Sequence, residues 1–169
     1  EETLTLNGKI VPDDNQVRSQ SSHVEGRIER LYVNTVGETV RRGQRIATLY
    51  SPELITAQQE LLQAAEMRAT NPQLLEAARQ RLRAFRITDA RIDQILTSKT
   101  IKNTMDAYAE WPGTVLEKKV NVGDHVMQGS VLYVVSNLSQ VWVEFDAYES
   151  DLSQVSLGDQ INFTVSALP

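Results

Sequence analysis

The sequence contains no cysteine, and this absence excludes several kinds of chemistry at once. Without a thiol the chain forms no disulfide bond, no thiolate zinc site and no cysteine-based nucleophilic centre. The absence is compatible with an oxidising compartment, in which stray thiols are a liability, but it does not by itself identify one. Aromatic residues are also sparse, at 6% of the chain, so we expect no module with a large aromatic core.

Long apolar runs are missing as well. No run approaches the roughly 18 residues that are needed to span a bilayer. The start, Glu1-Glu2-Thr3, lacks the basic and apolar stretches of a signal peptide. The strand-like end at Ala167-Leu168-Pro169 indicates a cut rather than a natural stop. We therefore expect a mature or excised segment, with any membrane anchor outside it.

The chain has no excess of positive charge. Lys and Arg number 17 against 22 Asp and Glu, which gives a net charge of -5. The basic residues are spread along the chain, and the only basic doublets are Arg41-Arg42 and Lys118-Lys119. Because nucleic-acid binding needs a concentrated basic face, we predict no nucleic-acid partner.

Motifs of catalysis and cofactor binding are also missing. No serine stands in a Gly-x-Ser-x-Gly context, and no phosphate-binding glycine loop is present. The two histidines, His23 and His125, are far apart in sequence, and the acidic clusters at Asp13-Asp14 and Glu149 with Asp151 are typical of turns. We predict no catalytic residue, no bound cofactor and no enzymatic activity.

An internal repeat is the most informative feature that is present. Each copy contains a glycine, a strand-like run, the pattern Val-Gly-acid-x-Val-x-x-Gly, a second strand-like run and a serine. The copies span 26–51 and 113–136, with their Val-Gly pairs at Val36-Gly37 and Val122-Gly123. β-Branched residues favour strands, and glycine permits the tight turns between them. Two such units can pack about a pseudo-twofold axis and close a flattened barrel.

Between the copies the apolar period changes to that of a helix. Three helix starts follow one another, at Ser51-Pro52-Glu53, Asn71-Pro72 and Thr88-Asp89, each with a capping side chain. We predict three short helices within about 51–99 that bury their apolar stripes against one another. The stripe residues are Leu54, Leu61, Leu62, Ala65 and Ala69, then Leu75, Ala78, Leu82 and Phe85, then Ile92, Ile95 and Leu96.

The flanks of the repeat have strand character again. Leu4–Val11 and Val141–Ala147 alternate with a period of two, which predicts strands. Tyr148–Val155 predicts a helical turn, Leu157-Gly158-Asp159 a tight turn and Ile161–Val165 a further strand. We expect these flanks to meet as an incomplete second β module.

The predicted fold is mainly β with a helical insertion. It is a split lipoyl/biotinyl-like β-sandwich (a barrel-sandwich hybrid), interrupted by a short helical hairpin or three-helix bundle and flanked by part of a β-barrel. The expected domains are a partial β-barrel at 1–17 and 138–169, a lipoyl-like domain at 18–50 and 104–137, and the helical domain at 51–103.

This arrangement resembles the membrane fusion proteins, which are the periplasmic adaptors of tripartite efflux pumps. The resemblance covers nearly the whole chain. Three segments look like the heavy-metal (copper and silver cation) resistance-nodulation-division branch: Leu49–Leu54 with Ala57-Gln58, Leu75–Leu82, and Asn137–Val143. The chain departs from the family pattern at Ala109–Gly113, the entry to the second half, and lacks the N-terminal methionines of copper and silver adaptors.

The resemblance implies a periplasmic adaptor that links an inner-membrane resistance-nodulation-division transporter to an outer-membrane channel and supports heavy-metal export. It further implies self-association into a ring, and an inner-membrane anchor in a segment outside this chain. Adaptors of this family contact the channel with the distal end of their helices. Here that end, about 28 Å from the start of the first helix, comprises Arg68, Thr70, Asn71 and Gln73.

Two alternatives stay open at this stage. An adaptor for drug efflux or polypeptide secretion has the same fold, although the short helical region argues against it. A lipoyl or biotin carrier carries its modified lysine at the hairpin between the two halves, where this sequence has helices instead.

A metal site is a separate hypothesis. His125 and Met127 are candidate ligands, because imidazole and thioether groups suit Cu(I) and Ag(I). The alternative is an exposed histidine and a packing methionine. Met67, Met105 and His23 complete the set of side chains of this kind.

Overall fold

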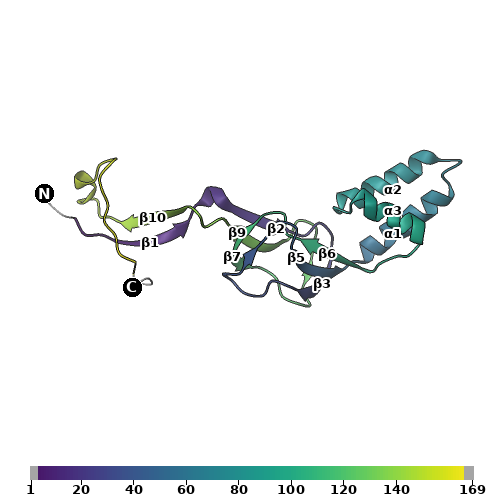
Figure 1. Cartoon of the computed structure of the whole chain (residues 1–169), viewed down its shortest axis with the longest axis horizontal. Coiled ribbons are helices and arrows are strands. Elements are labelled where there is room, and N and C mark those ends of the chain that lie inside the picture. Colours follow the sequence, from purple (N-terminus) through teal and green to yellow (C-terminus); the bar gives the residue numbers. More distant parts are fainter. Residues whose placement is uncertain (1–3, 166–169) are drawn as a thin grey trace.

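The computed structural model describes residues 4–165 and shows an elongated molecule (Figure 1). A two-stranded ribbon lies at one end, a β-sandwich in the middle and three helices at the other end. The chain therefore runs from the ribbon through the sandwich to the helices, and returns by the same route. Within residues 4–165 no helix is both long enough and apolar enough to cross a membrane.

Eight strands form the sandwich. They are β2 (Val17–Ser21), β3 (Gly26–Leu31), β4 (Thr39–Val40), β5 (Arg45–Tyr50), β6 (Thr104–Tyr108), β7 (Gly113–Lys118), β8 (His125–Val126) and β9 (Val131–Ser136). One antiparallel sheet has the order β2-β9-β7-β4 and the other β6-β5-β3-β8. Each sheet therefore combines strands from both copies of the sequence repeat.

The two repeat copies exchange their short strands. β4 of the first copy pairs with β7 of the second, and β8 of the second copy pairs with β3 of the first. Equivalent backbone bonds fix the exchange: Gly37 N–H donates to the Val115 carbonyl at 2.8 Å, and Gly123 N–H donates to the Ile28 carbonyl at 2.8 Å. Both glycines have φ of +94°, a conformation that glycine adopts without strain. The pseudo-twofold packing that the repeat predicts is present.

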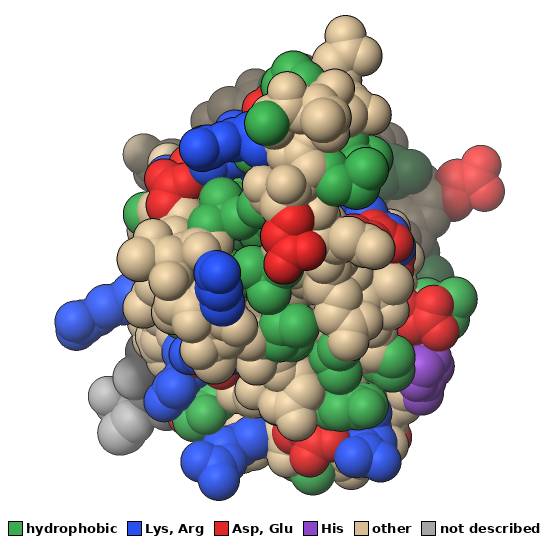
Figure 2. Space-filling view, turned by 90° about the vertical axis from the view of Figure 1, so that its right-hand side faces the viewer, with side chains coloured by type: hydrophobic (Ala, Val, Ile, Leu, Met, Phe, Trp, Pro, Cys, Tyr) green, Lys and Arg blue, Asp and Glu red, His purple; other side chains and the backbone are tan. Residues whose placement is uncertain are grey.

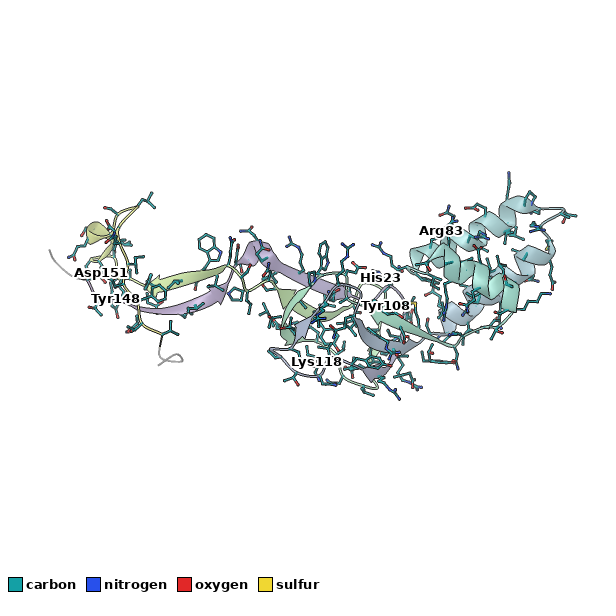
Figure 3. The ribbon with its side chains drawn as sticks, in the orientation of Figure 1. His23, Arg83, Tyr108, Lys118, Tyr148 and Asp151 are labelled. Atoms are coloured by element: carbon teal, nitrogen blue, oxygen red, sulfur yellow. The ribbon has the colours of Figure 1, made fainter. Side chains whose placement is uncertain are left out.

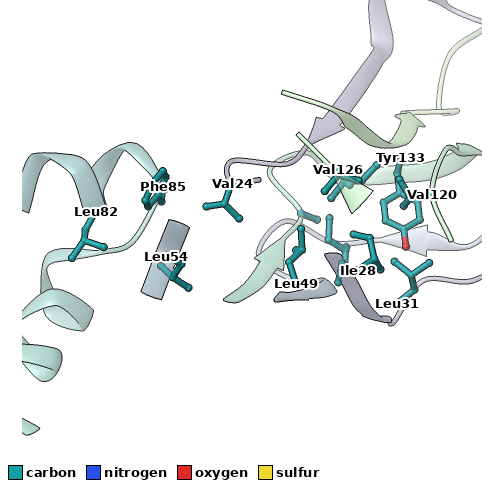
Figure 4. Packing of buried hydrophobic residues seen from close by; sticks show 14 of the residues in the cluster. Val24, Ile28, Leu31, Leu49, Leu54, Leu82, Phe85, Val120, Val126 and Tyr133 are labelled. Carbon is teal, nitrogen blue, oxygen red and sulfur yellow. The ribbon is translucent and has the colours of Figure 1, made fainter. Parts of the chain in front are cut away.

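Tyr133 ties the two copies together inside the sandwich core. Its side chain is 1% exposed, and its hydroxyl donates a 2.7 Å hydrogen bond to the Val33 carbonyl of the other copy. Figure 4 shows this ring beside Val120, Leu31 and Ile28. The buried hydroxyl thus has a partner, as the cost of an unpaired polar group requires.

We expect Tyr133→Phe to lower the free energy of unfolding by about 1–3 kcal/mol, because the buried Val33 carbonyl loses its partner. Burial, aided by the charge of Glu38, raises the pKa of Tyr133 from 10.0 to about 12. Below pH 10.0 the Tyr133 hydroxyl is neutral in both the folded and the unfolded state. As the pH rises from 10.0 to about 12, the hydroxyl loses its proton more readily in the unfolded state, so the free energy of unfolding falls. Urea unfolding at about pH 9 and at about pH 11.5 tests this. Between these two pH values the free energy of unfolding should fall more for the native chain than for Tyr133→Phe. Equal losses would contradict it.

Three helices form a bundle beyond the sandwich. They are α1 (Pro52–Glu66), α2 (Pro72–Ala84) and α3 (Asp89–Ser98). Each begins after a predicted capping residue, Ser51, Asn71 or Thr88, whose side-chain oxygen accepts a backbone N–H of the first turn. The prediction of three short helices is confirmed.

Most residues of the predicted apolar stripes form the bundle core or pack against it; Ala65 and Ala69 do not. Leu61, Leu82 and Ile92 are all 0% exposed. Ala69 was expected on the stripe of the first helix but is exposed. The reason is that α1 ends at Glu66, so that Ala69 lies in the following turn and not on the helix.

The flanks meet, as expected, in a ribbon of β1 (Asn7–Pro12) and β10 (Val141–Asp146), which pair antiparallel. Short 3-10 turns follow β1 at Asp14–Gln16 and β10 at Leu152–Gln154. The prediction of a strand at Ile161–Val165 is wrong, because this segment has no strand pairing in residues 4–165. An isolated strand has no neighbour for its N–H and C=O groups and is not stable. The expectations for residues 1–3 and 166–169 fall outside the described residues.

Candidate functional site

The residues predicted for partner contact lie at the end of the bundle farthest from the sandwich (Figure 1). Arg68, Thr70, Asn71 and Gln73 are all exposed. With 15 residues α1 is about 22 Å long, shorter than the expected 28 Å. Gln73 was expected in the turn but belongs to the first turn of α2.

The turn that joins α1 to α2 is closely hydrogen-bonded. The backbone N–H groups of Thr70 and Asn71 both donate to the Met67 carbonyl, at 3.1 and 2.8 Å, and the Thr70 hydroxyl donates to the same oxygen at 3.1 Å. Pro72 disfavours a helical conformation at Asn71, whose side chain then caps α2. These bonds explain why α1 ends early. They also present the distal polar side chains on an ordered turn.

A shallow apolar groove of about 450 Å³ adjoins this turn, between α1 and α2. Met67 and Leu74, which are 46% and 42% exposed, lie at the end of the groove beside the turn. Arg81 and Glu60, 2.5 Å apart, form an ion pair farther along it. The remaining lining residues are Gln63, Ala64, Ala77 and Ala78.

Sequence reasoning missed this groove. Its lining follows the helical spacing i, i+3, i+4, i+7 on both helices, from Glu60 to Met67 and from Leu74 to Arg81. That spacing defines a second face on each helix, beside the stripe that fills the core, and it could have been read from the sequence. Figure 2 looks onto this end of the molecule and shows hydrophobic side chains interspersed with acidic and basic ones.

The candidate metal ligands are both exposed: His125 lies on β8, and Met127 directly follows that strand, separated from His125 by the buried Val126. The structure adds a carboxylate: His125 Nε2 lies 3.1 Å from Glu25 Oε1. Within residues 4–165 no group of three or more His, Asp and Glu side chains is placed to hold a metal ion. The two ligands therefore stay a prediction.

The other histidine and methionines lie elsewhere. His23, at the side of the sandwich that faces the helices (Figure 3), has its Nε2 atom 2.6 Å from Glu110 Oε1. Met105 packs against the hydrophobic core, whereas Met67 lines the distal groove. The structure does not bring these side chains together as one ligand set.

The position at which a carrier protein bears its modified lysine has no counterpart here. β5 passes directly through Ser51 into α1, so the halves of the sandwich are joined by the bundle. Lys118 ends β7 on the sandwich, and Lys119 forms an ion pair with Glu117. Neither lysine lies at a hairpin between the two halves.

Comparison with known proteins agrees with this geometry. Residues 53–103 match the family model "CusB, three alpha-helical bundle domain". The cation efflux system protein CusB of Escherichia coli K12 is 27% identical over 144 residues, which cover 85% of this chain and 35% of CusB. The chain is thus similar in sequence to the cation efflux protein CusB, to the resistance protein CzcB and to the putative membrane fusion protein SilB.

Two further comparisons extend this relationship. The cobalt-zinc-cadmium resistance protein CzcB of Cupriavidus metallidurans is 25% identical over 176 residues, which cover 90% of this chain and 34% of CzcB. Among solved structures, ZneB of Cupriavidus metallidurans has a TM-score of 0.62 at 21% identity, covering 89% of this chain and 73% of ZneB. The resemblance and the fold class predicted from the sequence are confirmed. The chain spans about a third of the length of its curated relatives.

Proposed function

We propose that this chain is the central part of a periplasmic adaptor that links an inner-membrane transporter of the resistance-nodulation-division class to an outer-membrane channel, supporting export of heavy-metal cations. The observation that carries the proposal is the compact three-helix bundle set at the far end of a split sandwich. The relatives CusB and CzcB, named for cation efflux and for cobalt-zinc-cadmium resistance, support the cation class. The role is one of coupling and not of catalysis.

The proposal assigns one task to each part of the chain. Residues 51–103 are the helical domain that meets the channel. Residues 18–50 and 104–137 are a lipoyl-like domain that packs side by side with other copies in a ring. Residues 1–17 and 138–169 belong to a β-barrel domain that faces the transporter, with the membrane anchor in a segment outside this chain.

The distal turn and the groove together suit a partner protein. Arg68 and Asn71 on the ordered turn, and Gln73 at the start of α2, offer polar groups on ordered backbone, so that little conformational entropy is lost on binding. Met67 and Leu74 offer adaptable apolar surface beside them. An apolar centre with a polar rim is the usual anatomy of a protein interface.

Photo-crosslinking in the native periplasm tests the proposal. A photoreactive amino acid at Arg68, Asn71 or Gln73 should capture an outer-membrane protein, because these side chains are exposed at the distal end. The same probe at Glu144 in the ribbon, also exposed, is the matched control and should capture none. Capture of the channel from Glu144 but not from the tip would reverse the proposed orientation. Capture of no envelope protein from any position would contradict the adaptor role.

The remaining alternative is an adaptor for drugs or a secreted polypeptide. Deletion of the gene distinguishes the two substrates. We expect the deletion to raise sensitivity to copper, silver, zinc, cobalt or cadmium ions, with rescue by the native gene. Unchanged metal tolerance together with raised drug sensitivity would favour the alternative.

A further inference from the structure

The joint between the helical bundle and the sandwich is filled by a continuous hydrophobic core. Val24, which is 0% exposed, lies between the two parts, with Leu54 and Phe85 on the side of the bundle (Figure 4). These three side chains belong to one buried cluster with the sandwich residues, such as Ile28. The Ser22 hydroxyl donates to the Val24 carbonyl at 2.7 Å and orders the loop that carries Val24.

A buried glutamine connects the two chain segments that cross this joint, which are the start of α1 and the segment that returns to the sandwich after α3. Gln58 of α1 is 2% exposed. Its Nε2 atom donates to the Lys102 carbonyl at 2.7 Å and to the Leu54 carbonyl at 3.1 Å, while its Oε1 atom accepts the Lys102 N–H at 3.1 Å. The side-chain amide of Gln58 therefore both donates to and accepts from the backbone of Lys102, as a peptide group of a neighbouring strand would. Loss of the amide would leave buried backbone groups unpaired, which is costly.

Polar and charged side chains lie at the surface of the same joint. Glu110, which follows β6, lies 2.6 Å from His23 Nε2 and 4.0 Å from Arg86 Nε, just after α2. A second buried glutamine, Gln20, fixes the backbone of the segment that carries Glu110. Its side chain accepts a hydrogen bond from the Glu110 N–H and donates one to the Trp111 carbonyl, both at 2.9 Å. The bundle is thus fixed to the sandwich by apolar, amide and ionic contacts.

The joint between the sandwich and the ribbon is built differently. Two segments cross it, Asp13–Gln16 and Asn137–Gln140, and none of their residues is buried. Their hydrogen bonds are local, such as that from Ser139 N–H to Asn137 Oδ1 at 3.0 Å. Hydrogen bonding to the Trp142 side chain of β10, at the ribbon side of this joint, lowers the pKa of the Asp13 carboxyl group.

We propose that the bundle and the sandwich move as one rigid lever, with Gln58 as the residue that positions the bundle, and that bending is confined to Asp13–Gln16 and Asn137–Gln140. The consequence is a fixed angle between the distal turn and the sandwich, whatever the position of the ribbon. The proposal concerns the chain itself and holds independently of which ion or partner the assembly serves.

Spin labelling of the chain tests the proposal, and the lack of native cysteine makes single-site labelling direct. One label pair, at Gln73 and Arg42, spans the joint of the bundle, and a second, at Glu144 and Arg42, spans the joint of the ribbon. All three positions are exposed. In double electron–electron resonance we expect a distance distribution at least about twofold broader for the ribbon pair. Equal widths would overturn the proposal.

Variants of Gln58 then test its positioning role. We expect Gln58→Leu to broaden the distribution of the Gln73–Arg42 pair about twofold and to leave the ribbon pair unchanged. Gln59→Leu, at the exposed neighbouring position on α1, should change neither distribution. An unchanged width in Gln58→Leu with its helical circular dichroism intact would overturn the role of Gln58. If Gln58→Leu loses that helical signal, Val24→Ala replaces it as the test of the joint; we expect it to broaden the Gln73–Arg42 distribution, and an unchanged width would overturn the role of the buried joint contacts in fixing the bundle.

Discussion

Replacement of Gly26 by alanine is expected to lower the free energy of unfolding by about 3 kcal/mol or more, as severe overpacking does. A Cβ atom at this position would lie 2.3 Å from the Tyr50 carbonyl oxygen and 3.1 Å from its carbon. Both are backbone atoms of β5, which pairs with β3 through Arg27 opposite Tyr50. The clash cannot be relieved by rotating a side chain. Urea unfolding followed by circular dichroism measures the loss.

Gly123→Ala is the matched control for this substitution. A Cβ atom at Gly123 meets no heavy atom within 4 Å, so that only its φ of +94° opposes the change. The left-handed conformation costs an L-residue about 1–2 kcal/mol. Gly26→Ala should therefore be the more damaging of the two. A Gly123→Ala variant that is equally unstable would show that backbone conformation, and not close approach, explains the glycines.

Leu82→Ala is expected to destabilise the helical bundle by about 3–5 kcal/mol, since it leaves a cavity in a fully buried site. Leu82 is 0% exposed and lies in the bundle core (Figure 4). A bundle of this size has little stability to spare, so we expect a large loss of helical circular dichroism on mild heating.

Leu74→Ala provides the comparison on the same helix. Leu74 is 42% exposed at the distal groove, so its truncation should cost under about 1 kcal/mol and leave the helical signal intact. The same variant should weaken capture of a partner by the tip if the groove takes part in docking. Similar losses of stability in both variants would mean that the bundle core is not where the structure places it.

Much of the fold could be predicted because its determinants are local. The Val-Gly-acid pattern occurs twice, and each copy builds the same turn, with Gly37 and Gly123 at the same φ. The helix starts were predictable for a similar reason: a capping side chain at Ser51, Asn71 or Thr88 acts on a backbone N–H only three residues ahead.

The errors arose where a segment depends on distant neighbours. Ile161–Val165 has strand propensity, but propensity does not say whether a second strand lies beside it. The end of α1 depends on two N–H groups that turn back to Met67, and the apolar spacing that leads to Ala69 carries no sign of this. Apolar periodicity therefore predicted the helix better than it predicted its end.

The contacts of the candidate sites were hidden for the same reason. Glu25 is 100 residues from His125, and Gln58 is 44 residues from Lys102. No local pattern joins such residues. Gln58 stood within a segment typical of the family, yet its role became visible only when the fold placed Lys102 beside it.

The exchange of β4 and β8 also constrains how the molecule folds. Neither half of the sandwich contains all the strands of a sheet, so neither can close before both have been synthesised. The bundle lies between the halves in sequence and has its own local contacts, which form quickly. Once it has folded, the Gln58–Lys102 pairing brings the end of β5 close to the start of β6. We therefore expect a folded bundle to shorten the loop that the sandwich must close and to lower the entropic cost of closing it.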